Sequence, residues 1–191
     1  MQRLVIIFLI ANLFSLGGCN KMQKKVEDFL NPDNPKVVIE LNNGDQMFIE
    51  LFEKEAPKTV ENFLNLIEQK FYDNLIFHRI IKNFMIQGGD PLGNGMGGSD
   101  EKIPGEFKLN GFNNQVLHQR GVISMARSRD FNSASSQFFI CHQDAKHLDG
   151  SYAAFGYLFK GLEVLDKIAV VATDSNDKPL EDIIIKSIRQ I

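Results

Sequence analysis

Short apolar runs separated by glycine and asparagine clusters fill most of the chain, and they limit its fold more than any other feature. In VVIEL (37–41) and MFIEL (47–51), apolar residues alternate with outward neighbours, and the turn sequence NNGD (42–45) lies between them. This pattern predicts two half-buried strands joined by an Asn-Gly hairpin. Further strand-like runs follow, in the order LIFHRII, FMIQGG, GVISMA, SQFFIC, AAFGYLF and DIIIKSIRQI.

Only two segments show helical spacing. The apolar residues at positions 60, 63, 64 and 67 recur at intervals of three and four, which predicts an amphipathic helix from Pro57 to about Lys70. A second helix fits Leu162 to Val170. Many short strands with two helices argue against alternating βαβ units. They favour a mainly β fold, an antiparallel barrel or sandwich with helices capping it.

The composition indicates one globular domain. A chain of 191 residues with 43% hydrophobic residues can bury one sizeable core and is short for two. The formal net charge is -3, with acidic and basic residues spread along the chain, so no basic surface for nucleic acid is predicted. Nothing in the sequence indicates an oligomer, and we expect a monomer.

The first twenty residues have the pattern of an export signal. One positive charge at Arg3 precedes an apolar run from Leu4 to Leu16, and small residues stand just before Cys19. This run is short for a membrane span, so we expect residues 1–18 to be a signal peptide. The ending LGGC (16–19) also resembles the lipobox of bacterial lipoproteins, although an ordinary secreted protein with an incidental cysteine remains the alternative.

The lipobox resemblance implies that the chain is cut before Cys19 and that lipid, palmitate included, is attached to this residue as a membrane anchor. Asn20 after the cysteine favours the outer membrane of a Gram-negative host. We therefore expect a location in the bacterial cell envelope, with the domain facing the periplasm or the exterior.

Residues 19–35 are predicted to be the lipidated cysteine and a flexible tether, and residues 36–191 the folded domain. The tether sequence is polar, with Val26, Phe29 and Leu30 as its possible contacts. A flexible chain of this length would hold the domain roughly 20 Å from the membrane. Once Cys19 is lipidated, Cys141 is the other cysteine, so no intramolecular disulfide is expected and Cys141 is interpreted as a small buried hydrophobe.

Two sequence features resemble binding motifs, one for phosphate and one for zinc, but neither has the surrounding sequence that such a site needs. GNGMGG (93–98) contains a literal G-x-G-x-x-G, but SDEKIPG (99–105) follows it, which does not begin a helix that could bind phosphate. The four histidines and Cys141 lack the paired spacing of a structural zinc site. We therefore expect no cofactor and no metal, and we expect His78 to be a histidine satisfied within the sheet.

Several long motifs, all in order, resemble the cyclophilin-type peptidyl-prolyl isomerases. They are FHRII-x-x-FMIQGGD, GNGMGG, SMAR, SASSQFFI and LDG-x-YAAFG, and the resemblance runs from about Val37 to Ile191. It implies a closed eight-stranded antiparallel β-barrel capped by two α-helices. It also implies an active face on the outside, because side chains fill the interior of so small a barrel.

The resemblance assigns roles residue by residue. The catalytic residues that it implies are Arg79, which matches the catalytic arginine of the family, Phe84 and Gln87. The substrate-binding residues that it implies are Met85, Ala126, Arg127, Gln137, Phe139, His147, Leu148 and Tyr152.

Three of these positions depart from the best-known eukaryotic pattern. Arg127 replaces an asparagine, His147 a tryptophan and Tyr152 a histidine, and the arginine and tyrosine are similar to the bacterial branch of the family. Because the tryptophan position contacts cyclosporin in the family, we expect His147 to weaken that binding.

The resemblance implies an enzyme that accelerates rotation about X-Pro bonds in proline-containing segments and assists the folding of exported or envelope proteins. A cation at Arg79 that donates to the proline nitrogen favours the twisted amide over the planar one. Two alternatives stay open. Arg79 could be half of a structural ion pair, and the chain could be a non-catalytic proline-peptide-binding chaperone or adhesion-type lipoprotein that uses the same groove.

Overall fold

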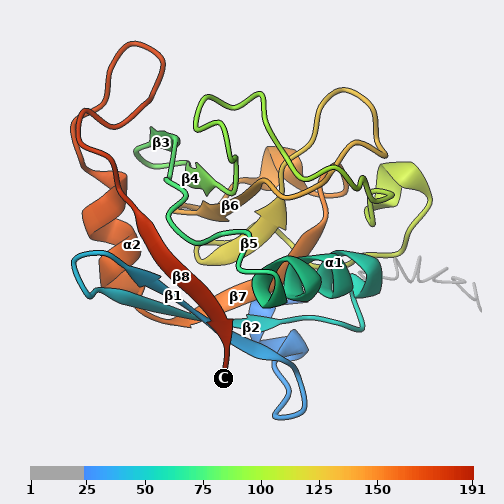
Figure 1. Ribbon diagram of the computed structural model, residues 1–191. Coiled ribbons are helices and arrows are strands. Elements are labelled where there is room, and N and C mark those ends of the chain that lie inside the picture. The colour runs from blue at the N-terminus through green and yellow to red at the C-terminus, as the bar shows by residue number, and fades with distance from the viewer. Residues whose placement is uncertain (1–23) are drawn as a thin grey trace, which may run out of the picture.

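The computed structural model describes residues 24–191, so the predicted signal peptide and Cys19 lie outside the described residues. Eight strands form one antiparallel sheet in the order β3-β4-β6-β5-β7-β2-β1-β8 (Figure 1). The strands are β1 (Lys36–Leu41), β2 (Gln46–Leu51), β3 (Arg79–Ile81), β4 (Met85–Gly88), β5 (Val122–Met125), β6 (Phe138–Cys141), β7 (Ala154–Lys160) and β8 (Ile185–Gln190).

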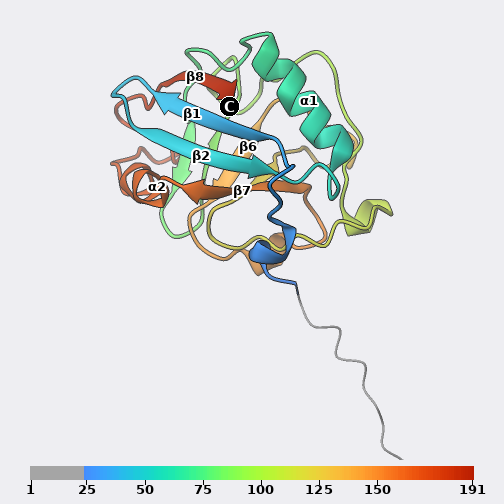
Figure 2. The ribbon, with the colours of Figure 1, turned by 90° about the horizontal axis from the view of Figure 1, so that it is seen from below.

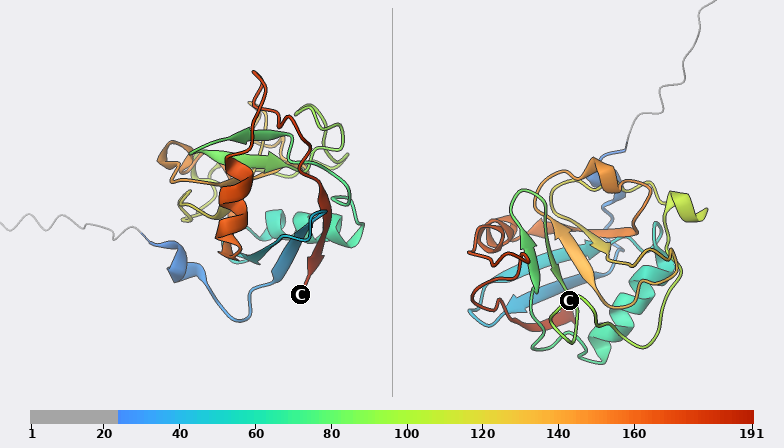
Figure 3. Two further views of the ribbon diagram at one scale, coloured as in Figure 1. Left: turned by 90° about the vertical axis from the view of Figure 1, so that its left-hand side faces the viewer. Right: turned by 90° about the horizontal axis from the view of Figure 1, so that it is seen from above.

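Two α-helices, α1 (Pro57–Glu68) and α2 (Leu162–Ala169), lie on opposite sides of the curled sheet, α2 on the left and α1 on the right in Figure 1. Helix α1 packs against β8, and α2 reaches from β3 and β4 across to β2 (Figures 2 and 3). Both helices agree with the predicted segments to within two residues. No helix within residues 24–191 is both long and apolar enough to cross a bilayer.

The predicted closed barrel is wrong, because the sheet is an open, curled half-barrel whose ends are β3 and β8. An isolated bridge, Ile76 to Ile184, joins the segment before β3 to the start of β8. Beside it, the N–H of Phe77 donates to the carbonyl of Ile183 at 3.0 Å, and the N–H of Ile185 donates to that of Leu75 at 2.8 Å. Farther along, the outward backbone N–H of Ile80 in β3 donates to the carbonyl of Asp177, at 2.8 Å. The loop between α2 and β8 therefore occupies the edge where the closing strand would have to pair.

The core fills the concave side of the sheet. Helix α1 buries Val60 and Phe63 there, and Phe63 meets the ring of Phe138 edge-on at 5.6 Å between centroids. Ala56 offers no side-chain cap to α1. Instead Glu106, which is 2% exposed, accepts the N–H of Lys58 at 3.0 Å and that of Thr59 at 2.8 Å, so a distant carboxylate satisfies the free donors of the helix end.

Residues 26–35, here called the strap, are docked on the domain. Val26 and Phe29 in the 3₁₀ turn η1 (Val26–Phe29) are 5% and 8% exposed. They pack against a small apolar cluster apart from the main core, formed by Phe52, Val116, Val122 and Ala154. The N–H of Val26 donates to Gln119 Oε1 at 3.0 Å.

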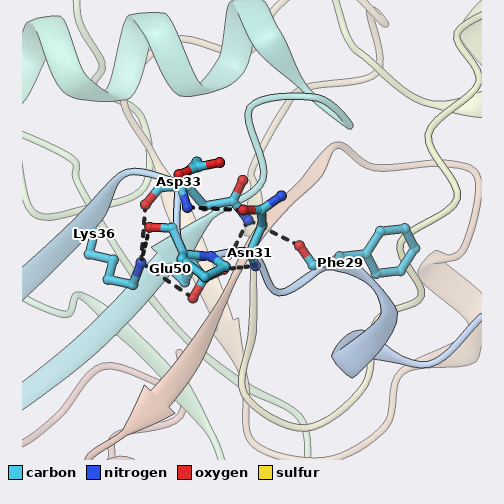
Figure 4. A network of polar contacts seen from close by, with 7 residues as sticks. Phe29, Asn31, Asp33, Lys36 and Glu50 are labelled. Atoms are coloured by element: carbon cyan, nitrogen blue, oxygen red, sulfur yellow. Dashed lines mark hydrogen bonds and ion pairs between the residues drawn. The ribbon is translucent and has the colours of Figure 1, made fainter.

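Polar contacts fix the second half of the strap (Figure 4). Glu50 on β2 is 6% exposed, and its Oε1 accepts the N–H of Asn31 at 2.6 Å and Nδ2 of Asn34 at 2.9 Å. Lys36 Nζ lies 3.8 Å from its other oxygen. A buried carboxylate without partners is costly. Residues 26–35, which the sequence assigned to the tether, are therefore docked on the domain, where the strap gains apolar burial and satisfies Glu50.

We expect Phe29→Ala to lower the free energy of unfolding by about 2–4 kcal/mol, because it removes a buried ring and leaves a cavity. Urea denaturation followed by circular dichroism measures the change. Leu30→Ala is the matched control, since Leu30 is 39% exposed and its loss should change stability by less than about 0.5 kcal/mol. Equal stabilities for the two variants would mean that the strap does not dock in solution.

Candidate functional site

The alternation of side chains along β3, β4 and β6 produces a second apolar face outside the core. Ile80, Ile86 and Ile140 point into the main core. The alternate residues of these strands point to the other side, where Met85, Phe139, Cys141, Ala145 and Leu148 form a separate buried cluster. Because successive side chains in a strand point to opposite faces, the same three strands serve both clusters.

Strand register brings the polar residues of this outer face into one row. Arg79 on β3 lies opposite Gln87 on β4, and Gln87 lies opposite Phe139 on β6. A hollow of about 250 Å³ opens over this row. All nine residues that line it are predicted site residues, namely Arg79, Phe84, Met85, Gln87, Ala126, Arg127, Phe139, Leu148 and Tyr152.

The two remaining predicted residues lie beside the hollow. Gln137 lines a neighbouring hollow of about 480 Å³ that shares Gln87, Ala126 and Arg127 with the first one. The ring of His147 packs against Phe84 at 5.3 Å between centroids, and His147 is exposed. It therefore lies at the rim, and its expected effect on cyclosporin binding stays a prediction.

Two glutamines connect the hollow to the glycine-rich loop. Gln87 Nε2 donates to Gln137 Oε1 at 2.8 Å, and Gln137 Nε2 donates to the carbonyls of Gly95 at 3.1 Å and Gly97 at 2.7 Å. With both amides already bonded in one orientation, their remaining groups are fixed in direction. The GNGMGG segment is thus a support for Gln137 and does not lead into a helix.

Asp90 holds this loop in place. Its carboxylate accepts the backbone N–H of Leu92 at 2.8 Å, Asn94 at 3.0 Å and Gly95 at 2.6 Å. Burial by itself raises the pKa of Asp90, but these backbone donors outweigh it and lower the pKa below its usual value. The anion therefore persists at neutral pH and keeps the loop closed over its side chain.

The apolar wall of the hollow is rigidly supported. Phe139 meets Tyr152 edge-on, with 5.9 Å between ring centroids. The buried ring of His118 stacks on Phe139, with 6.0 Å between centroids and 17° between the ring planes. His118 is held by Ser124 Oγ at 3.0 Å from Nε2 and by Asp149 Oδ1 at 3.0 Å from Nδ1. Sequence reasoning missed this support, since no local pattern links residues 31 positions apart.

The Ser124, His118 and Asp149 contacts have the connectivity of a hydrolase triad, but they cannot act as one. Ser124 is 0% exposed and His118 is 1% exposed. A nucleophile must reach the reacting atom, and this hydroxyl faces no solvent. Burial likewise raises the pKa of the Cys141 thiol to about 12, so this cysteine is not a nucleophile either.

The two arginines of the site differ in how many donors they keep. Arg127 Nε and Nη2 donate to the carbonyl of Ser151 at 3.0 and 2.8 Å, and its Nη1 donates to that of Ser128 at 2.8 Å. Its guanidinium also lies 4.6 Å from the ring centroid of Tyr152. Arg127 is therefore locked as part of the wall.

Arg79 pairs through one edge of its guanidinium. Its Nε lies 3.3 Å from Asp177 Oδ2, and both side chains are 42% exposed. The ion pair that the sequence left open as an alternative thus exists, and Arg79 also lines the hollow. Asp177 was missed by sequence reasoning, because nothing in the polar segment TDSNDKP distinguishes it from its neighbours.

His78 lies next to Arg79 in sequence but belongs to the interior. It is 5% exposed, and neither ring nitrogen has a hydrogen-bond partner within residues 24–191, so the expectation that it is satisfied within the sheet is wrong. Burial lowers its pKa, with Asp90 opposing the shift. No group of three or more histidine, cysteine, aspartate or glutamate residues in this part of the chain could hold a metal ion.

Comparison with known proteins gives one consistent family. The family model described as "Cyclophilin type peptidyl-prolyl cis-trans isomerase/CLD" matches residues 36–190. Peptidyl-prolyl cis-trans isomerase CYP18-2 of Arabidopsis thaliana is 39% identical over 150 residues, which cover 78% of this chain and 89% of the plant protein. A Streptococcus pyogenes serotype M6 relative, whose name combines a phosphatase with a peptidyl-prolyl cis-trans isomerase, is 42% identical over 210 aligned positions.

The streptococcal alignment covers 92% of this chain but only 44% of the relative, so the chain spans less than half of that protein's length. Among solved structures, the crystal structure of a Cryptosporidium parvum cyclophilin type isomerase in the presence of the dipeptide Ala-Pro has a TM-score of 0.74 and 39% sequence identity. The match covers 80% of this chain and 96% of that one.

The buried state of His78 predicts a loss of stability in acid. A histidine whose pKa is lower in the folded state than in the unfolded state binds its proton preferentially on unfolding, so stability falls as the pH drops below the unfolded value of about 6.5. We expect the stability of His78→Leu to fall less than that of wild type between pH 7.5 and 5.0, because the substitution removes this part of the pH dependence. Urea unfolding at the two pH values measures it.

The control is His147→Leu, which makes the same substitution at an exposed histidine and shows the effect of replacing an imidazole without changing a buried site. Parallel pH profiles for wild type and His78→Leu would contradict the prediction, since His78 would then titrate alike in the folded and unfolded chain.

Proposed function

The chain belongs to the cyclophilin-type peptidyl-prolyl cis-trans isomerase family, and we propose that it isomerises X-Pro bonds in the 250 Å³ hollow, with Arg79 as the catalytic group. The observation that carries this assignment is the row of Arg79, Gln87 and Phe139 across β3, β4 and β6. It places a cation, a fixed amide and an aromatic wall around one small cavity.

The reaction needs no bond to be broken. The barrier to rotation about an X-Pro bond is near 20 kcal/mol and comes from amide resonance. In the twisted transition state the proline nitrogen loses conjugation and gains a lone pair that can accept a hydrogen bond. A donor that bonds this nitrogen more strongly than it bonds the planar amide lowers the barrier by differential binding.

Arg79 is suited to this role because it stays ionised and keeps donors that its partner does not use. Asp177 lies against Nε, and the two Nη groups carry four further N–H donors. The wall formed by Phe84, Met85, Phe139 and Leu148 would hold the proline ring and exclude water. In such surroundings a charged hydrogen bond is stronger than in bulk solvent.

The two glutamines would hold the peptide while the rest of the chain rotates. Gln87 and Gln137 are bonded to each other, and Gln137 is bonded to the glycine-rich loop. Amides fixed in this way can bind the carbonyl and N–H groups on either side of the proline without reorganising. The substrates are therefore proline-containing segments of other proteins, in keeping with the Ala-Pro dipeptide present with the Cryptosporidium structure.

A non-catalytic module that only grips proline segments would need the apolar pocket and the amides. It would not need a cation with free donors beside the pocket, which argues for the enzyme.

We expect Arg79→Ala to lower kcat/KM at least about tenfold, which equals about 1.4 kcal/mol of transition-state stabilisation. A proline-peptide isomerisation assay on the full chain measures it. Arg189→Ala is the matched control, because Arg189 is an exposed arginine on β8 that does not line the hollow. If Arg79→Ala binds a proline peptide normally but keeps the wild-type rate, Arg79 is not catalytic and the gripping module gains support.

The proposal includes an envelope location, with an export signal at residues 1–18 and a lipid anchor at Cys19. Support comes from the sequence pattern and from a bacterial relative. From Cys19 to the docked Val26 the chain can reach at most about 25 Å, even when fully extended. The strap therefore keeps the domain close to the bilayer, where it would act on exported or envelope proteins.

Metabolic labelling with radioactive palmitate tests the anchor. We expect wild type and Cys141→Ser to carry the label and to fractionate with membranes, because Cys141 is fully buried and is not the labelled thiol. Cys19→Ser should carry no label and should not fractionate with membranes. Label that persists in Cys19→Ser would refute lipidation at this residue.

A further inference from the structure

The connection between α2 and β8 forms a tight loop that rises above β3 (Figure 1). Within it, the backbone N–H of Asp174 donates to the carbonyl of Lys178 at 2.8 Å, and Asp174 Oδ1 accepts the N–H of Asn176 at 2.8 Å and of Lys178 at 3.0 Å. An isolated bridge joins Thr173 to Pro179 below the turn. These bonds give the loop one defined shape although it is exposed.

Asp177 contacts two consecutive residues of β3 from this loop. Its carbonyl accepts the N–H of Ile80 at 2.8 Å, and its carboxylate lies 3.3 Å from Arg79 Nε. Its backbone has φ +63°, a left-handed conformation that residues other than glycine, asparagine and aspartate rarely adopt. The turn holds Asp177 in this conformation, which aims its carbonyl and its carboxylate at the same strand.

The geometry points to Asp177 as a positioning residue for Arg79 in the isomerisation, a role that rests on the proposed function. Within residues 24–191, Asp177 is the side chain that bonds the Arg79 guanidinium. The bond takes the Nε edge and leaves both Nη groups for the proline nitrogen. An arginine side chain has many rotamers, and one whose edge is fixed beforehand loses less freedom when it reaches the transition state.

A second effect of the carboxylate opposes the first. A negative charge beside Arg79 weakens the potential that the cation offers to the substrate. Because both side chains are 42% exposed, water and salt screen this effect of the carboxylate charge. The orientation of the guanidinium is less sensitive to screening, so we expect the positioning effect to dominate and removal of the carboxylate to slow the reaction.

The test uses Asp177→Gly and Asp177→Asn in the full chain. Glycine adopts positive φ readily and keeps the carbonyl that bonds Ile80, so the first variant removes the carboxylate alone. We expect it to lower kcat about three- to tenfold with KM little changed, because the proline pocket is intact. Asp177→Asn should recover part of the rate, since the amide oxygen can accept the Nε–H and asparagine tolerates this backbone conformation.

Asp182→Gly is the matched control, because it removes an exposed carboxylate from the same connection and should leave kcat unchanged. A double-mutant cycle separates positioning from a general effect on folding. In an Arg79→Ala background, Asp177→Gly should cause no further loss. A wild-type or raised kcat for Asp177→Gly, or an additional loss in the Arg79→Ala background, would overturn the inference.

A spectroscopic readout is independent of turnover. The Arg79 Nε–H resonance in ¹⁵N-edited NMR should exchange slowly with water in wild type and in Asp182→Gly, and fast in Asp177→Gly. Identical exchange in all three proteins would overturn the positioning role even if the enzyme is active. Slow wild-type exchange in a protein without isomerase activity would instead refute the proposed function and leave the Asp177 contact confirmed.

Discussion

The pleat of β3, β4 and β6 is the constraint on which the site depends. Ile80, Ile86 and Ile140 are buried inside the curled sheet, so the residues between them must point outward. A shift of register by one residue would turn Arg79 into the core and Ile80 onto the surface. The burial that stabilises the fold therefore also fixes the direction of Arg79, Gln87 and Phe139, and the site needs no strained backbone on these strands to present them.

The open edge of the sheet has a direct connection to this row. A closing strand beside β3 would bond the outward N–H of Ile80, and the site would then border regular sheet. Here the carbonyl of Asp177 takes that N–H, and the backbone that supplies it brings a carboxylate to the neighbouring arginine. The departure from a closed barrel thus places a charged side chain beside Arg79, from a loop far away in sequence.

Strand alternation and helical spacing were enough to predict the mainly β class and both helices, whereas the active face on the outside of the sheet came from the family resemblance. The residues of the hollow were predicted by matching motifs to a known family, because spacing alone cannot select Arg79 over a structural arginine. The docking of the strap was not predicted, although Val26, Phe29 and Leu30 were named as possible contacts, because the burial of Val26 and Phe29 depends on Phe52 and Val122, which are distant in sequence. His118 and Asp177 were missed for the same reason, because their partners come from tertiary contacts.

The two arginines show why partial exposure suits the proposed chemistry. Arg127 has three of its nitrogens bonded to carbonyls and three aromatic rings around its guanidinium, which stabilises the wall but leaves it little to offer a substrate. An arginine with no partner would keep all its donors and no fixed direction. Arg79 lies between these limits, because its Nε is bonded to Asp177 and its side chain lines the hollow. A donor that must bond a lone pair present only in the twisted amide needs this combination of fixed direction and free N–H groups.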